Sequence, residues 1–227
     1  MRHVVLLLLT LVHATVMVPG AFGQGLIVVM SQTGGGAAPT QPTMQLTATR
    51  GRFDIPGLGQ VFYNAETKTM RVIPAILKAY LEYTPQSVQQ LVAAGRGVAP
   101  QPRITYRRSG TSRVKQWPCT LYEGTRGADK LTEICVTQGA GIALAAADFA
   151  LVQEAIDLAA PFTAQDALER IPVYGTTAKH GYAGFPVRRT FFRAGQPPIV
   201  TELVEFRREA VPPANLEVPP GYNKAGQ

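Results

Sequence analysis

The stretch Trp117–Val136, "WPCTLYEGTRGADKLTEICV", contains both cysteines of the 227-residue chain and predicts a β-hairpin. Its flanks, "WPCTLYE" and "LTEICVT", are typical of strands, and the "GTRGADK" between them is typical of a turn. If the hairpin turns about Gly127, Cys119 lies directly opposite Cys135, and opposed β-carbons lie about 4.5–5.5 Å apart, near the spacing of a disulfide. We therefore expect a disulfide between Cys119 and Cys135.

The other roles of a cysteine pair fit this spacing poorly. A redox pair normally shows C-x-x-C, and two thiols without nearby histidines cannot complete a tetrahedral metal site. A structural disulfide is typical of an oxidising compartment.

The first residues indicate the same compartment. "MRH" is a short positive start, the apolar run Val4–Val18 follows, and Pro19-Gly20 ends it. Ala21 and Gly23 are small residues with signal-peptidase spacing, so residues 1–23 are predicted to be a signal peptide cleaved before Gln24. The alternative is an uncleaved anchor continuing through "GLIVVM", but the run is short for a membrane span of about 20 apolar residues. We expect a periplasmic or secreted protein, with residues 24–227 as one domain and no stable membrane span.

The rest of the chain mostly alternates in the way of half-buried strands. The segment 77–83 reads as a strand, although a helix remains a competitor there. The predicted strand regions are 25–32, 43–55 as a single strand, the hairpin 59–74, 77–83, 103–107, the disulfide hairpin, and a final hairpin at 184–209 turning at Ala194-Gly195.

Two main helices are predicted. The first is capped by Thr84, has Pro85 in its first turn and ends at Gly95. The second spans Ile142–Ala160, is stopped by Pro161, and carries an apolar face, while Asp148, Glu154 and Asp157 are available for its wet side. Hairpins with few helices predict an α+β fold, with an antiparallel sheet and helices on one face.

Basic residues outnumber acidic ones, 22 to 15, and they are densest in "RITYRRSGTSRVK". This run is interpreted first as a solvated sheet face, and alternatively as a landing patch for anionic envelope surfaces such as acidic lipid headgroups. Nucleic acid is not expected as a partner, since no binding motif is recognisable. The candidate basic patch consists of Arg103, Arg107, Arg108, Arg113 and Lys115.

Catalytic patterns are missing from the sequence. His180, in the loop-like context "TAKHGYAGF", is the one histidine after residue 23, and no serine stands in G-x-S-x-G. No H-E-x-x-H, EF-hand or Walker pattern is present. The carboxylates Glu202 and Glu205 lie three apart on a predicted strand, which should place them on opposite faces; long-range carboxylate pairs stay open. We expect no catalytic residues, no metal and no cofactor.

Several segments in order resemble an uncharacterised family of exported bacterial proteins, domain of unknown function 4412. They are "YNAETKTMRVIP", "KAYLEYT", "WPCTLYE", "EICV", "GFPVRRTFF" and the ending "LEVPPGYNK", and they span most of Gln24–Lys224. The family pattern has Phe where this chain has Leu216. That family is similar to the lipoprotein-carrier superfamily, which implies a curved, incomplete antiparallel barrel closed by helices over an apolar cavity.

By this resemblance, the chain is expected to be a non-catalytic exported protein that binds a lipid or another hydrophobic envelope ligand. The alternatives are a structural or interaction protein that contacts another envelope protein, and a cell-wall hydrolase. An enclosed apolar cavity would favour the first, a flat apolar patch the second, and carboxylates converging on His180 the third.

Overall fold

The computed structural model describes residues 24–99, 103–138, 142–164, 168 and 171–225. The predicted signal peptide, residues 1–23, lies outside this range. No helix among the described residues has the length and apolar composition needed to cross a bilayer.

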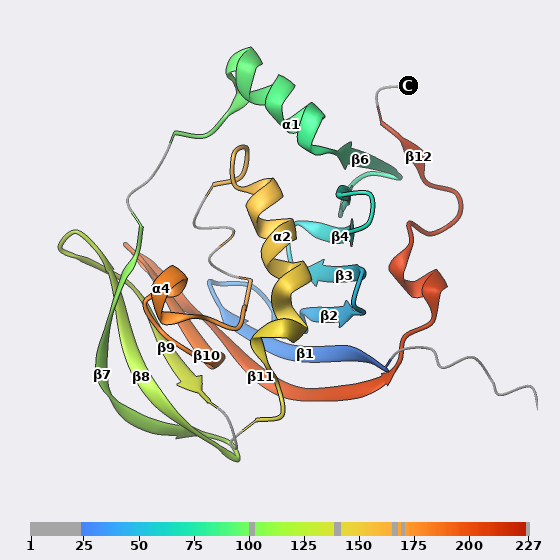
Figure 1. The fold of residues 1–227 in the computed structure, drawn as a ribbon. Coiled ribbons are helices and arrows are strands. Elements are labelled where there is room, and N and C mark those ends of the chain that lie inside the picture. The colour runs from blue at the N-terminus through green and yellow to red at the C-terminus, as the bar shows by residue number, and fades with distance from the viewer. Residues whose placement is uncertain (1–23, 100–102, 139–141, 165–167, 169–170, 226–227) are drawn as a thin grey trace, which may run out of the picture.

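A single curved sheet forms the body of the protein (Figure 1), and its twelve strands lie within the described residues. Their order is β12-β6-β5-β4-β3-β2-β1-β11-β10-β9-β8-β7, and every pairing is antiparallel except that of β12 with β6. The strands are β1 (Gln24–Gly34), β2 (Thr43–Leu46), β3 (Arg50–Ile55), β4 (Gly59–Asn64), β5 (Thr69–Pro74), β6 (Ala79–Tyr83), β7 (Thr105–Val114), β8 (Trp117–Arg126), β9 (Asp129–Thr137), β10 (Phe185–Arg193), β11 (Gln196–Ala210) and β12 (Asn223–Lys224). The sheet is open, with β12 and β7 at its ends, and the predicted α+β fold is confirmed.

The helices are short. The α-helices are α1 (Pro85–Leu91), α2 (Ala150–Ala159) and α4 (Thr177–His180), accompanied by a π-helical turn at Val92–Arg96 and 3-10 turns at Ala146–Phe149 and Pro213–Leu216. Thr84 caps α1 as predicted: its hydroxyl accepts from the Ser87 amide. Gly95 adopts φ 73° near the end of the π-helical turn, a conformation that suits glycine.

The main core lies between α2 and the sheet, and α2 crosses in front of β1–β4 in Figure 1. Leu26, Val28 and Met30 alternate along β1 as buried residues, within a continuous apolar run that predicted a strand but not which of its faces is buried. Leu151 of α2 packs so close to β3 that a Cβ on Gly51 would lie 2.5 Å from its Cδ2 atom. Glycine at 51 therefore lets the helix approach the sheet.

The long helix predicted for Ile142–Ala160 is mostly not helical in its first half. The α-helix begins only at Ala150, after a 3-10 turn, and Asp148 accepts a hydrogen bond from the Ala145 amide. Arg208 of β11 contacts Asp148 Oδ2 at 2.8 Å and the Ala143 carbonyl at 3.0 Å. Asp148, predicted on the wet side, therefore anchors this turn to the sheet. The spacing of apolar residues along a predicted helix cannot reveal such a tertiary contact.

Two other sequence predictions are corrected. The segment 43–55 is two strands, because the Thr47 amide donates to the Arg50 carbonyl at 2.8 Å and closes a turn. The open choice at 77–83 resolves as strand β6, which begins at Ala79 and pairs with β5.

The disulfide between Cys119 and Cys135 is present, but the predicted register is off by two residues. Cys135 pairs with Leu121 rather than with Cys119. A bulge at Gly124–Thr125 shifts the register of the hairpin beyond its turn. The bridge thus joins diagonal neighbours, whose Cα atoms lie 5.3 Å apart. This distance lies within the range that a disulfide tolerates.

Candidate ligand-binding cavity

A cavity of about 750 Å³ lies beside α2, on the side of the helix that faces β7–β10. Two faces of α2 explain its position. Leu151, Val152 and Ala155 are buried against the sheet, whereas Ile156 and Asp157 line the cavity. The helix therefore separates the main core from the cavity.

The lining is mainly apolar on one side. The apolar lining residues come from the C-terminal half of α2, from the segment before β7 and from the segment that follows α2. They are Val98, Ala99, Ile104, Ile156, Ala160, Pro161, Ala164, Leu168, Ile171 and Val173. A volume of this size, lined mostly by apolar side chains, is typical of small-molecule sites.

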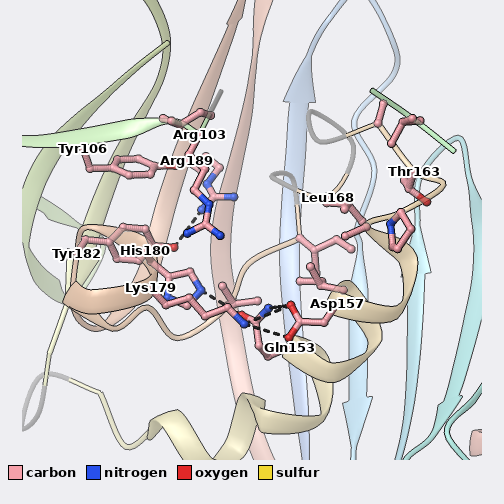
Figure 2. Close-up of a pocket in the computed structure, with 18 of the residues that line it drawn as sticks. Arg103, Tyr106, Gln153, Asp157, Thr163, Leu168, Lys179, His180, Tyr182 and Arg189 are labelled. Carbon is pink, nitrogen blue, oxygen red and sulfur yellow. Dashed lines mark hydrogen bonds and ion pairs between the residues drawn. The ribbon is translucent and has the colours of Figure 1, made fainter. Parts of the chain in front are cut away.

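The opposite side of the cavity carries a hydrogen-bonded polar network between α4 and α2 (Figure 2). Lys179 of α4 contacts the Asp157 carboxylate at 3.0 Å. The Gln153 amide nitrogen donates to Asp157 Oδ1 at 2.8 Å. His180 Nε2 lies 3.0 Å from Gln153 Oε1. The network holds α4 against α2 across the cavity.

The network also determines which nitrogen of His180 carries the proton. The Thr176 backbone amide donates to His180 Nδ1 at 3.0 Å, so Nδ1 must accept. The neutral ring then has its proton on Nε2, which donates to Gln153 Oε1. Both ring nitrogens are thus engaged within the protein.

Behind this network lies a group of aromatic rings around a buried arginine. Tyr182 packs edge-on against Tyr106, with ring centroids 5.1 Å apart, and its ring also neighbours those of Tyr122 and His180. Arg189 of β10 is 7% exposed, and its Nη2 donates to the Tyr182 hydroxyl at 3.3 Å. Figure 2 shows Arg189 between Tyr106 and His180. The cavity therefore combines an apolar side with a polar, positively charged one.

A hydrogen bond also joins α2 to the sheet, on the side of the helix away from the cavity. The Tyr63 hydroxyl of β4 donates to Glu154 Oε2 at 3.2 Å. Burial above all, and then the Glu154 carboxylate, raise the pKa of Tyr63 to about 12. The phenol therefore remains a protonated donor throughout the physiological range.

Most of this cavity was not predicted from the sequence. His180 was expected in a loop, but the residue ends α4, where Gly181 at φ 76° terminates the helix. Asp157 was predicted on the wet side of its helix, and it is indeed exposed, at the edge of the cavity. The pattern of Gln153, Ile156 and Asp157 on one helical face was the signal that could have marked this wall.

The candidate basic patch does not form one surface. Arg103 lines the cavity, and Lys115 lies in the turn between β7 and β8 with φ 51°. Arg107 and Arg108 are neighbours on β7 and point to opposite faces of the sheet. A bulge between Arg108 and Gly110 places Arg113 on the same face as Arg108, because their partners on β8, Pro118 and Tyr122, are four residues apart.

A bulge also overturns the prediction made for Glu202 and Glu205. Glu202 pairs with Ser31 and Glu205 pairs with Val29, so the two carboxylates lie on the same face of β11. The register shift opposite Val29 and Met30 changes the parity of the strand. Glu205 forms an ion pair with Arg207, which neutralises its charge.

Comparisons with known proteins identify no family for this chain. No family model matches it, and neither does any curated protein. The resemblance to domain of unknown function 4412 therefore remains a prediction.

Solved structures align with most of this chain, but with low TM-scores and low sequence identity. An uncharacterised conserved protein from Thermus thermophilus aligns with a TM-score of 0.46 at 14% identity, over 88% of this chain and 89% of that one. A LolA superfamily protein from Nitrosomonas europaea aligns with a TM-score of 0.28 at 9% identity, over 86% and 90%. A DUF1329 family protein from Desulfovibrio piger aligns with a TM-score of 0.30 at 12% identity, over 86% and 90%. Scores this low add nothing about what this chain binds.

Proposed function

We propose that this chain is a non-catalytic, exported binding protein whose cavity beside α2 holds a lipid or another hydrophobic ligand. The observation that carries the proposal is the cavity itself, about 750 Å³ in volume and lined on one side by apolar residues. Removing apolar ligand surface from water supplies roughly 25 cal/mol for each Å² that is buried. The polar side would orient an amphiphilic ligand, because Lys179, Arg189 and Tyr182 lie along one wall.

Export is part of the proposal, and it rests on the signal-like residues 1–23 and on the disulfide. N-terminal sequencing of the protein purified from its native envelope tests it. A mature chain that begins within a residue or two of Gln24 supports export with cleavage, and retention of the apolar run restores an anchored form.

The polar network supports binding better than hydrolysis. A general base needs a free nitrogen aimed at a substrate, but both ring nitrogens of His180 are held by Thr176 and Gln153. The Asp157 carboxylate is paired with Lys179. The contacts of these groups serve to hold α4 against α2.

Native mass spectrometry with lipid extraction tests the binding function, using protein purified gently from its native envelope. Ala160 is exposed at the end of α2 and lines the cavity, so A160W fills space there without removing a core side chain. Ala93 is exposed and is not among the lining residues, which makes A93W a matched control. We expect a bound lipid on the wild type and on A93W, and its loss from A160W. A clean apo mass for the wild type, or equal retention by both variants, would contradict the proposal.

A further inference from the structure

Strand β7 forms a free edge of the sheet. It pairs with β8 on one side, and the strand order ends there within the described part of the chain. In Figure 1 it is the outermost strand at that end of the sheet. Arg107, Arg108, Thr111 and Arg113 are exposed along it. The outward-facing backbone groups of such an edge are a template for another strand.

Cations that have no paired carboxylate lie close together on this edge. Many cations in other places are matched by carboxylates, as in Arg50–Glu217, Arg52–Asp54, Arg71–Glu82, Lys130–Glu123, Lys179–Asp157, Arg207–Glu205 and Arg208–Asp148. The cations elsewhere that form no ion pair among the described residues, such as Lys68, Lys78, Arg96 and Arg193, are spread singly along the chain. Within the described ranges, Arg107, Arg108, Arg113 and Lys115 form no ion pair. Glu123 lies opposite Arg107 in the ladder, but it is bound by Lys130 at 2.9 Å. Uncompensated positive charge is thus concentrated along β7.

The placement of these charges on both faces of the edge selects the kind of partner. Arg108 and Arg113 lie on one face and Arg107 on the other. A flat membrane surface can meet only one face at a time. Side chains of a strand alternate between faces, so one extended segment with acidic side chains can meet both sets of arginines. A second copy of β7 would bring like charges together, which opposes pairing of two copies at this edge.

We propose that the edge of β7 binds an acidic, extended segment of a partner protein as an added strand. Backbone hydrogen bonds along β7 supply the pairing, and Arg107, Arg108 and Arg113 select for glutamate and aspartate. The surface lies outside the residues that line the cavity, apart from Tyr106 at its start. The inference therefore does not depend on the ligand-binding function.

Fluorescence anisotropy with a defined probe tests this surface. The probe is a fluorescein-labelled peptide built from the repeat Thr-Glu-Glu-Val, whose adjacent glutamates face both sides of a strand. A second peptide of equal charge has proline in place of each valine, which removes backbone donors. The variant R108A/R113A is compared with R96A/R193A, which removes two exposed arginines away from β7. Vesicles of phosphatidylcholine with and without phosphatidylglycerol are tested in parallel.

We expect the valine peptide to bind, and hydrogen exchange to slow at amides of β7. The R108A/R113A variant should bind it roughly threefold to tenfold more weakly at low salt, while R96A/R193A should bind as the wild type does. Equal binding of the proline peptide would overturn strand addition. Binding to the anionic vesicles alone would assign the arginines to a membrane. If the protein binds neither the peptides nor the vesicles, the proposal is also overturned, and the arginines have the role of keeping other strands off the edge.

Discussion

Loss of the Cys119–Cys135 disulfide is expected to lower the free energy of unfolding by an amount that the loop length predicts. The two cysteines are 16 residues apart in sequence. In the chain-entropy model, closing a loop of this length restricts the unfolded chain and stabilises the fold by about 3 kcal/mol. Both side chains are buried, at 7% and 1% exposure, so removing the two sulfur atoms costs roughly 1–2 kcal/mol more.

The two contributions are separable by comparing three proteins in urea at neutral pH. They are the oxidised wild type, the wild type under a reducing agent, and the C119A/C135A variant. Reduction keeps the sulfur atoms and removes only the link, so it should cost about 3 kcal/mol. The double variant should lose roughly 1–2 kcal/mol beyond that. The slope of unfolding free energy against urea should rise in both, because an unlinked chain exposes more surface when it unfolds.

A difference of less than about 1 kcal/mol between the oxidised and reduced wild type would refute this reasoning. It would mean that the hairpin of β8 and β9 keeps its ends together in the unfolded chain, so that the link restricts little. Mass mapping without reduction provides the control that the oxidised sample is bridged.

Two further predictions concern the packing of α2 and the end of the sheet at β12. G51A should destabilise the fold by roughly 1–3 kcal/mol, because its Cβ would lie 2.5 Å from Leu151 Cδ2. The control is G110A, whose Cβ would have its nearest neighbour at 4.0 Å. Equal urea midpoints for the two variants would contradict the packing argument. Hydrogen bonds, first from Lys224, hold the pKa of Glu82 below its usual 4.5, so this carboxylate stabilises the fold above that pH and the contribution is lost as pH falls through the lowered pKa. E82Q should therefore have a lower free energy of unfolding than the wild type at neutral pH, and the two values should converge in acid. A difference between the two free energies that stays constant across urea titrations from pH 7 downward would show that Glu82 does not titrate in this way.

Local rules predicted the elements of this fold better than their boundaries. The strand at residues 25–32 and the cap at Thr84 depend on neighbouring residues, and both were predicted. The first half of the helix predicted from Ile142 failed because Asp148 is held by Arg208, a residue from a distant part of the chain. Pattern reasoning has no access to such a contact.

Bulges account for the errors in register and in side-chain facing. One extra residue in a strand moves each later side chain to the other face, and the bulges that insert Ser109, Leu131 and Val204 were not predicted. The disulfide was still predicted correctly, since diagonal neighbours in a twisted hairpin come close enough to bridge. The pair of Glu202 and Glu205 was placed wrongly for the same reason.

Sequence alone determined the hairpins, the α+β class and the cysteine pairing, because each of these follows from residues close together in the chain. Tertiary structure decided the rest. The cavity gathers Gln153 and Asp157 from α2, Lys179 and His180 from α4, and Arg189 from β10, and only the packed sheet brings them together. The arginines of β7 are another case, because whether a charged strand is central or at an edge depends on the order in which all the strands pair. Local sequence carries no information about that order, which is set by burial of the whole sheet around α2.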